Sequence, residues 1–263
     1  MKLENKVAIV TGGAMGNGLG IVKVFLKYKA KVAIIDYSEK VHETCEALQK
    51  EGYEVSGYVC DVRDTTTIAT CVEDILKKYG TIDILVNNAG IAWLDTFMNT
   101  SDELRDAHFD INIKGAWNMA KAVVPTMIKN QKGAIVNLSS VTGPMVADPG
   151  EVAYATTKAA LMGFTKGLAA EMVTHNIRVN AILPGYIMTP MVEGIAKTSD
   201  SSNPDSVIEG IRAGIPMGRL GKIEELGELA AFLSSDEASY ITAQGIVIDG
   251  GSTLPETMSV GVQ

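Results

Sequence analysis

The chain has 263 residues, of which 46% are hydrophobic and 21% are charged, and its formal net charge is −8. This composition fits one compact α/β domain with a large core. Because the charge is negative and lysine and arginine form no run, nucleic acid and anionic membranes are not expected as partners. No apolar run approaches the ~20 residues of a membrane helix, and the N-terminus has no signal-peptide pattern.

The cysteines and histidines of the chain follow no known ligand pattern. Cys45, Cys60 and Cys71 form no C-x-x-C pair, and their number is odd. Histidine and cysteine do not cluster at metal-ligand spacing, so we expect reduced thiols, no metal site and a cytoplasmic location. The three histidines lie outside every motif described below and are assigned no catalytic role: His42, His108 and His175.

Short apolar runs alternate with segments of helical period along the whole chain. The expected strands are residues 6–10, 31–35, 55–60, 82–86, 134–138, 177–183 and 244–248. Helices are expected after the first strand to about residue 29 and at residues 39–51, 66–79, 101–130, 154–175 and 222–234. Such alternation predicts a doubly wound parallel α/β sheet of seven strands, a Rossmann fold of order 3-2-1-4-5-6-7. We expect one domain, residues 1–263, in which residues 190–221 form a lid-like insertion.

A glycine-rich turn, TGGAMGNG, follows the first expected strand and opens the first helix. Gly12, Gly16 and Gly18 allow a tight turn, and a helix N-terminus offers free N–H groups to a pyrophosphate. The alternative is a glycine-rich loop without a ligand. Asp36 ends the second expected strand, where a carboxylate accepts bonds from the adenosine ribose and repels a 2′-phosphate. The alternative is a solvated acid at a strand end. No arginine or lysine lies between positions 12 and 20 or directly after Asp36, which favours NAD as the cofactor.

Tyr154 and Lys158 are four residues apart in an expected helix, so their side chains share one face. A phenol with a pKa of roughly 10 is a poor base at neutral pH, and a nearby cation lowers that pKa. A fall of about three pKa units requires ~4 kcal/mol and brings the phenol into the range where acid–base catalysis works best. The alternative is a chance pair on an exposed helix face.

Six motifs occur in one order, and together they resemble the short-chain dehydrogenase/reductase family from residue 3 to about residue 251. They are TGGAMGNG, the tetrapeptide Asn87-Asn88-Ala89-Gly90, Asn112, Ser140, the pair Tyr154 and Lys158, and Pro184-Gly185 followed by Thr189. The resemblance implies that Tyr154 exchanges the hydroxyl proton and that Lys158 also holds the nicotinamide ribose. It further implies that Ser140 hydrogen-bonds the substrate oxygen and that Asn112 supports a water relay.

The resemblance also implies where the cofactor binds. Asp61 would contact the adenine amino group, unless it starts a helix. The backbone near Ile187 and the Thr189 hydroxyl would hold the nicotinamide carboxamide. Asn17 departs from the family, which usually has an aliphatic residue there. The predicted cofactor-binding residues are Gly12, Met15, Gly16, Asn17, Gly18, Asp36, Tyr37, Asp61, Val62, Asn88, Ala89, Gly90, Tyr154, Lys158, Pro184, Gly185, Ile187 and Thr189.

The predicted function is an NAD(H)-dependent oxidoreductase that interconverts a secondary alcohol and its ketone. Bulky apolar residues on the expected site loops favour a large apolar substrate such as a hydroxysteroid, although the same residues suit lid packing: Trp93, Leu94, Met145, Val146, Tyr186, Met188 and Met191. One alternative is a 3-oxoacyl thioester reductase that uses NADPH. Another is a catalytically silent NAD-binding sensor or assembly protein.

The resemblance also implies a homotetramer. Subunits would pair through the helical segments 101–130 and 154–175, where Ala155, Ala159, Ala160 and Gly163 allow close approach. These small residues also suit packing on the protein's own sheet. The tail after Gly251 has no helical or strand period, and we expect it to pack at a subunit boundary.

Overall fold

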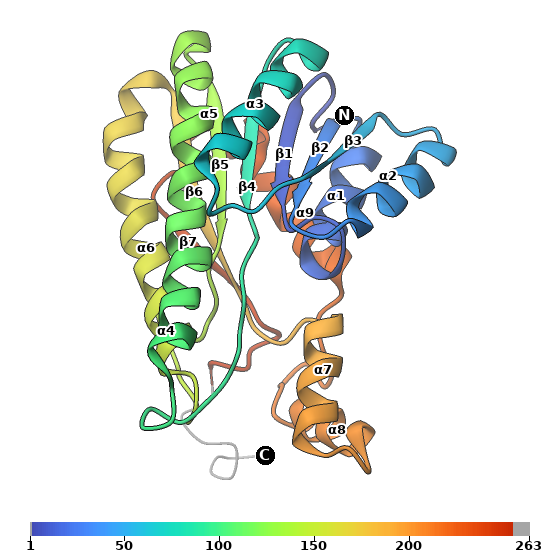
Figure 1. The fold of residues 1–263 in the computed structure, drawn as a ribbon, viewed down its shortest axis with the longest axis vertical. Helices are drawn as coiled ribbons and strands as arrows, with labels where there is room; N and C mark the ends of the chain where they lie inside the picture. Colours follow the sequence, from blue (N-terminus) through green and yellow to red (C-terminus); the bar gives the residue numbers. More distant parts are fainter. Residues whose placement is uncertain (1, 255–263) are drawn as a thin grey trace.

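Seven parallel strands form one sheet in the computed structural model, which describes residues 2–254 (Figure 1). Their order is β3-β2-β1-β4-β5-β6-β7, which confirms the predicted fold. Each strand lies within one or two residues of its expected position. The strands are β1 (Val7–Thr11), β2 (Lys31–Asp36), β3 (Val55–Val59), β4 (Ile84–Asn87), β5 (Gly133–Leu138), β6 (Ile177–Pro184) and β7 (Gly245–Ile248).

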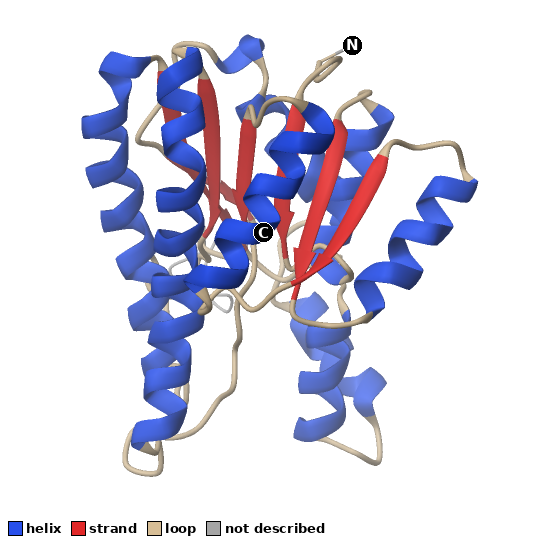
Figure 2. Ribbon diagram, turned by 45° about the horizontal axis from the view of Figure 1, so that its top comes forward, coloured by secondary structure: helices blue, strands red, loops and turns tan. Residues whose placement is uncertain are grey.

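Helices cover both faces of the sheet (Figure 2). Strand β1 shows why, because successive side chains of a strand point to opposite faces. Ala8 and Val10 belong to the core beneath α1 and α9, whereas Val7 and Ile9 belong to the core beneath α3 and α5. The helices are α1 (Gly16–Lys27), α2 (Lys40–Lys50), α3 (Thr65–Tyr79), α4 (Asp102–His108), α5 (Ala116–Asn130), α6 (Val152–Met172), α7 (Pro190–Ser199), α8 (Pro204–Ala213) and α9 (Ile223–Ser234).

The long helix expected over residues 101–130 is interrupted. A π-helical segment, η1 (Phe109–Gly115), joins α4 to α5 and contains Asn112. The wider turn fits the side-chain chemistry, because the Asn112 amide bonds a neighbouring loop instead of its own helix. Such π-helical insertions are frequent at functional sites. Short 3₁₀ turns, η2 (Val173–His175) and η3 (Asp236–Ala238), follow α6 and α9.

The segment 190–221 leaves the sheet after β6 and carries α7 and α8, which lie beyond the carboxyl ends of the strands (Figure 1). Its two ends are tied together. The Gly221 N–H donates to the Tyr186 carbonyl at 3.0 Å, and the Met188 N–H donates to the Gly221 carbonyl at 2.9 Å. A small apolar cluster of its own holds the segment together: Val192, Ile215 and Leu220.

Two further sequence expectations concern membranes and the tail. Within residues 2–254, no helix is long and apolar enough to cross a membrane. The expected packing of the tail concerns residues that, from position 255 on, lie outside the described part of the chain. The last described side chain, Leu254, is exposed.

Candidate active site

A cavity of about 600 Å³ opens at the carboxyl ends of the strands, between the sheet and α7. Its size is in the range of cofactor and ligand sites. Loops that follow β1 to β6 line it, together with residues of α6 and α7. Of the predicted catalytic and cofactor-binding residues, all but Gly18 and Asn112 line this cavity, and these two lie directly behind the lining. Of the seven apolar residues expected on the site loops, Met145, Val146 and Met188 do not line it.

The glycine-rich turn forms the floor of the cavity beside α1. Gly12 and Gly16 have φ angles of +62° and +55°, a region that favours glycine. A Cβ on Gly18 would lie 2.1 Å from the Gly12 carbonyl oxygen, so the helix can pack on the turn only with glycine there. Met15 gives α1 no side-chain cap, which leaves its first N–H groups for an anion.

Asn17, the residue that departs from the family pattern, lies at this turn. Its Oδ1 atom is buried and has no hydrogen-bond partner within the described residues. A buried polar atom without a partner is costly. A bound dinucleotide could supply the donor, because the residue faces the cavity.

The carboxyl end of β2 places a buried acid at one side of the cavity. Asp36 accepts N–H bonds from Ala14 at 3.1 Å and Ser38 at 3.0 Å. Its carboxylate is therefore held in place and still has free lone pairs. Tyr37 next to it is 80% exposed, so its ring is free to cover a ligand.

Arg63 also lines the cavity and was missed by the sequence analysis. It comes two residues after Asp61, outside residues 12–20 and the residues directly after Asp36, on which the cofactor prediction rests. Its guanidinium holds the Asp61 carboxylate through two 3.0 Å contacts from Nε and one of 2.5 Å from Nη2. The hydrogen bond from Arg63 lowers the pKa of Asp61. Asp61 does not cap α3, since Asp64 does so.

Tyr154 and Lys158 lie one turn apart on α6 and both face the cavity. The Lys158 Nζ atom is 5.6 Å from the centre of the Tyr154 ring and donates to the Leu138 carbonyl at 2.8 Å. Two of its three donors stay free for a ligand. Burial lowers the pKa of Lys158 to about 8.

The pKa of Tyr154 differs from the sequence expectation. Burial raises it, and a hydrogen bond with the Ser140 side chain offsets this in part. The neighbouring lysine does not bring the phenol pKa down in the protein alone. The expectation failed because it considered the charge of Lys158 and not the desolvation of both groups.

Ser140 lies at the end of β5, where the sheet stops and the cavity begins. Its side chain is buried, and its Oγ atom accepts the Thr142 N–H at 3.1 Å. The Ser140 hydroxyl also hydrogen-bonds the Tyr154 side chain, so both groups face the same part of the cavity. Ser140 can thus orient a carbonyl or hydroxyl group next to Tyr154.

Asn112 ties the loop after β4 to α6. Its Oδ1 accepts the Ile91 N–H at 2.8 Å, and its Nδ2 donates to the Ile91 carbonyl and to Thr157 Oγ1, each at 3.0 Å. Thr157 in turn donates to the Tyr154 carbonyl at 2.8 Å. Asn112 therefore positions the backbone on both sides of the site.

His108 makes a similar contact one helical turn earlier, although the sequence analysis gave it no role. It is fully buried on α4, and its Nδ1 lies 2.8 Å from the Leu104 carbonyl. Because a carbonyl only accepts, Nδ1 carries the proton and Nε2 accepts the Trp93 N–H at 3.2 Å. The signal was the spacing, since His108 precedes Asn112 by four residues and shares its face.

Comparison with known proteins identifies the family. A family model described as Enoyl-(Acyl carrier protein) reductase matches residues 12–253. The chain is also 51% identical over 261 residues to oxidoreductase UcpA of Escherichia coli strain K12, with 99% of each chain covered. The chain belongs to the short-chain dehydrogenase/reductase family.

Two other members of the short-chain dehydrogenase/reductase family extend the comparison. The 3-oxoacyl-(acyl-carrier-protein) reductase FabG of Thermotoga maritima is 42% identical over 255 residues, with 95% of this chain and 99% of that protein covered. A solved structure of levodione reductase matches with a TM-score of 0.91 and 31% identity, covering 95% of this chain and 98% of that one. The protein is therefore an oxidoreductase of a family that binds a nicotinamide dinucleotide.

Proposed function

We propose that this protein uses NAD(H) to interconvert a secondary alcohol and its ketone. One observation carries the proposal: Ser140, Tyr154 and Lys158 line the same cavity as the glycine-rich turn. A nicotinamide dinucleotide, when bound, donates or accepts the hydride. The residues of the chain then have to bind the substrate oxygen and move one proton.

Ser140 and Tyr154 would share the substrate oxygen. The Ser140 hydroxyl, which bonds Tyr154 in the protein alone, would donate its proton to the substrate oxygen once that oxygen lies beside both groups. Tyr154 gives its proton to the forming alkoxide during reduction and takes it back during oxidation. In the protein alone the phenol pKa is raised, so Tyr154 starts as the proton donor in the direction of reduction.

Lys158 would hold the nicotinamide ribose through its two free donors. Its third donor is bonded to the Leu138 carbonyl, which fixes the orientation of the Lys158 side chain. Its positive charge would also stabilise the tyrosinate that forms when Tyr154 loses its proton. Asn112 would support the water relay, with its amide fixed by Ile91 and Thr157.

Asp36 supports the choice of NAD over NADP. The carboxylate is held at the carboxyl end of β2, where a 2′-phosphate would meet its charge. Arg63, the cation that could compensate, is engaged with Asp61. The competing assignment, a 3-oxoacyl thioester reductase that uses NADPH, is favoured by the name of the FabG relative.

A bulky apolar substrate is the finer part of the proposal. Trp93, Leu94, Tyr186 and Met191 line the cavity and are each at least 39% exposed. Apolar surface at the mouth of a site favours an apolar ligand. Residues 190–221 would act as the lid over it, hinged where Gly221 is bonded to Tyr186 and Met188.

The test is a turnover screen of hydroxysteroids, aliphatic alcohols, sugars and 3-oxoacyl thioesters, each with NAD(H) and with NADP(H). Turnover of a hydroxysteroid or another large alcohol with NAD supports the proposal. Turnover restricted to thioesters with NADPH selects the competing reductase. Nucleotide binding without turnover of any compound selects the silent NAD-binding sensor or assembly protein.

A homotetramer in the cytoplasm completes the proposal. On α6, Ala160, Gly163 and Gly167 form an exposed strip of small side chains, which allows a second helix to approach closely. Beside it Trp117, which is 56% exposed, packs on Phe164 with ring centres 5.3 Å apart.

The three cysteines are buried and form no disulfide, in line with a reducing compartment. Light scattering at micromolar concentration tests the assembly, and an active monomer would contradict it.

A further inference from the structure

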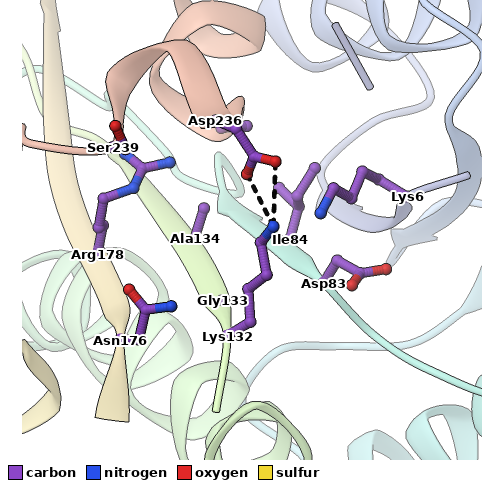
Figure 3. A pocket seen from close by; sticks show the side chains of 11 residues that line it. Lys6, Asp83, Ile84, Lys132, Gly133, Ala134, Asn176, Arg178, Asp236 and Ser239 are labelled. Atoms are coloured by element: carbon purple, nitrogen blue, oxygen red, sulfur yellow. Dashed lines mark hydrogen bonds and ion pairs between the residues drawn. The ribbon is translucent and has the colours of Figure 1, made fainter. Parts of the chain in front are cut away.

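A second, smaller pocket lies at the opposite end of the sheet, where β1, β4, β5 and β6 begin. Its volume is about 200 Å³. Residues at the starts of those strands and at the end of α9 line the pocket (Figure 3). Five charged side chains line it: Lys6, Asp83, Lys132, Arg178 and Asp236.

Both acids of the pocket are already engaged. Asp83 accepts the Val7 N–H at 2.9 Å, and Asp236 pairs with Lys132 at 3.0 Å. Figure 3 shows the Lys132 side chain reaching up to Asp236 while the Lys6 ammonium points into the same space. Three cations against two carboxylates leave one excess positive charge.

Lys6 and Arg178 share this excess, because within the described residues no carboxylate lies at ion-pair distance from either side chain. The Lys6 ammonium is partly buried. Burial and the neighbouring Lys132 lower the pKa of Lys6, and the charges of Asp236 and Asp83 offset this in part. An anion between the two ammonium groups would relieve this repulsion.

A buried hydroxyl gives a second, independent indication of a ligand. Ser234, at the end of α9, lines the pocket and is 4% exposed. Its Oγ atom is buried and has no hydrogen-bond partner within residues 2–254. Buried polar atoms are nearly always bonded, so this hydroxyl lacks a partner at the wall of the pocket.

Arg178 holds the pocket's wall. Its guanidinium donates to the carbonyls of Leu233 at 2.7 Å and Ser235 at 2.9 Å, so it closes the C-terminal end of α9 around Ser234. Arg178 thus makes the wall rigid and positive, and the donors left for a ligand are those of Lys6 and Lys132. Oxyanions bind where several such donors converge.

We infer that this pocket binds a small oxyanion of the phosphate class, held by Lys6, Lys132 and the Ser234 hydroxyl. The two ammonium groups and the hydroxyl supply donors for separate oxygen atoms. A bound anion would stabilise the folded protein, and the gain would grow with the logarithm of the anion concentration once that exceeds the Kd. It lies at the amino ends of the strands and the larger cavity lies at their carboxyl ends, so the two sites are separate.

Titration calorimetry with inorganic phosphate on the full chain tests this inference. The protein is saturated with NAD in one series and NADP in another, so that the glycine-rich turn is occupied. We expect one saturable phosphate site in wild type. Lys6→Met and Lys132→Met should each weaken it about tenfold, because a hydrogen bond to a charged group is worth roughly 1.5 kcal/mol or more.

Two variants serve as matched references. Ser234→Ala removes the hydroxyl with almost no change in shape and should weaken binding about threefold, as for a neutral hydrogen bond. Lys50→Met removes an exposed lysine at the end of α2 and should bind phosphate as wild type does. Melting temperatures in phosphate and in chloride of equal ionic strength should follow the same order.

The outcomes separate clearly. No saturable binding in wild type, or equal binding by wild type, Lys6→Met and Lys132→Met, overturns the inference. Comparing all variants in the same salt removes the general stabilising effect of phosphate on folded proteins. A parallel series with glycerol 3-phosphate assigns the source: tighter binding than phosphate indicates a phosphate monoester, and weaker binding indicates the free oxyanion.

Discussion

The two ends of the sheet carry very different sites. The carboxyl end opens into a cavity of about 600 Å³ with one fully buried cation, Lys158. The amino end has a pocket of about 200 Å³ with five charged side chains, of which Lys132 and Asp236 are exposed and the other three are partly buried. A charge acts strongly only where water is excluded, because solvent screens exposed pairs. We therefore expect the large effects of mutation on turnover and on folding stability at the carboxyl end, whereas mutations at the amino end should change anion binding and leave turnover nearly unchanged.

Tyr154→Phe is the strongest test of the carboxyl end. The variant should bind the nucleotide as wild type does, while turnover falls by about 10³-fold, because the hydroxyl acts only in proton transfer. Tyr186→Phe is the matched control, since Tyr186 lines the same cavity and should retain turnover. If Tyr154→Phe keeps most of its activity, the assignment of the proton donor is wrong.

Lys158→Met should separate stability from activity. The fall of the Lys158 pKa from 10.5 to about 8 is caused by burial and corresponds to roughly 3 kcal/mol. This penalty is fully present below pH 8. It decreases between pH 8 and 10.5, because there the unfolded chain binds the proton and the folded chain does not.

The expected result is therefore an inactive but more stable protein. Allowing ~1 kcal/mol for the lost bond to Leu138, the free energy of unfolding of Lys158→Met at pH 7 should exceed that of wild type by about 2 kcal/mol. Urea unfolding without nucleotide should show this difference shrinking as the pH rises toward 10. A variant less stable than wild type at pH 7 would show that burial of the charge is not costly here.

Asp36→Ala tests the choice of cofactor at the same end. Wild type should prefer NADH to NADPH. In the variant, the ratio of kcat/KM for NADH to kcat/KM for NADPH should fall about tenfold, because the repulsion of a 2′-phosphate is removed. Asp36→Asn removes the charge at constant shape and keeps an acceptor for one of the Ala14 and Ser38 N–H groups, which bond different oxygens of the carboxylate. Arg63→Leu should have the same kcat and KM for NADPH as wild type, because the Arg63 guanidinium is already paired with Asp61. Equal use of both cofactors by wild type would refute the prediction.

The sequence predicted the sheet well for a physical reason. Strands buried on both faces are continuous apolar runs, and the glycine, Tyr154 and Lys158 motifs have fixed spacing. It failed where distant segments meet. The π-helical turn at Asn112 depends on a bond to Ile91, and the raised pKa of Tyr154 depends on burial. The charges of the amino end follow no motif, since they come from five separate segments.

His108 was given no role from the sequence although its spacing from Asn112 was a signal, and its predicted effect is the smallest. Together with Asn112 it holds two alternate residues of the loop after β4, Ile91 and Trp93. Trp93 lines the cavity, so loss of its anchor should loosen the substrate side of the site and leave the chemistry intact. His108→Leu should raise KM for the substrate about fivefold, the equivalent of one hydrogen bond of ~1 kcal/mol, with kcat within about twofold of wild type.

The substrate KM, compared with the melting temperature, shows whether His108 positions the Trp93 loop or only stabilises the fold. His108→Gln can accept from the Trp93 N–H and donate to the Leu104 carbonyl, so it should recover most of the KM, whatever its melting temperature. His175→Leu is the control, because His175 bonds only the Gln131 side chain at the amino end, and its KM should equal that of wild type. If His108→Leu and His108→Gln lose stability equally and share the wild-type KM, the loop does not depend on this histidine. In that case the buried polar contacts of the carboxyl end serve folding alone, and its difference from the amino end rests on Tyr154, Lys158 and Asp36.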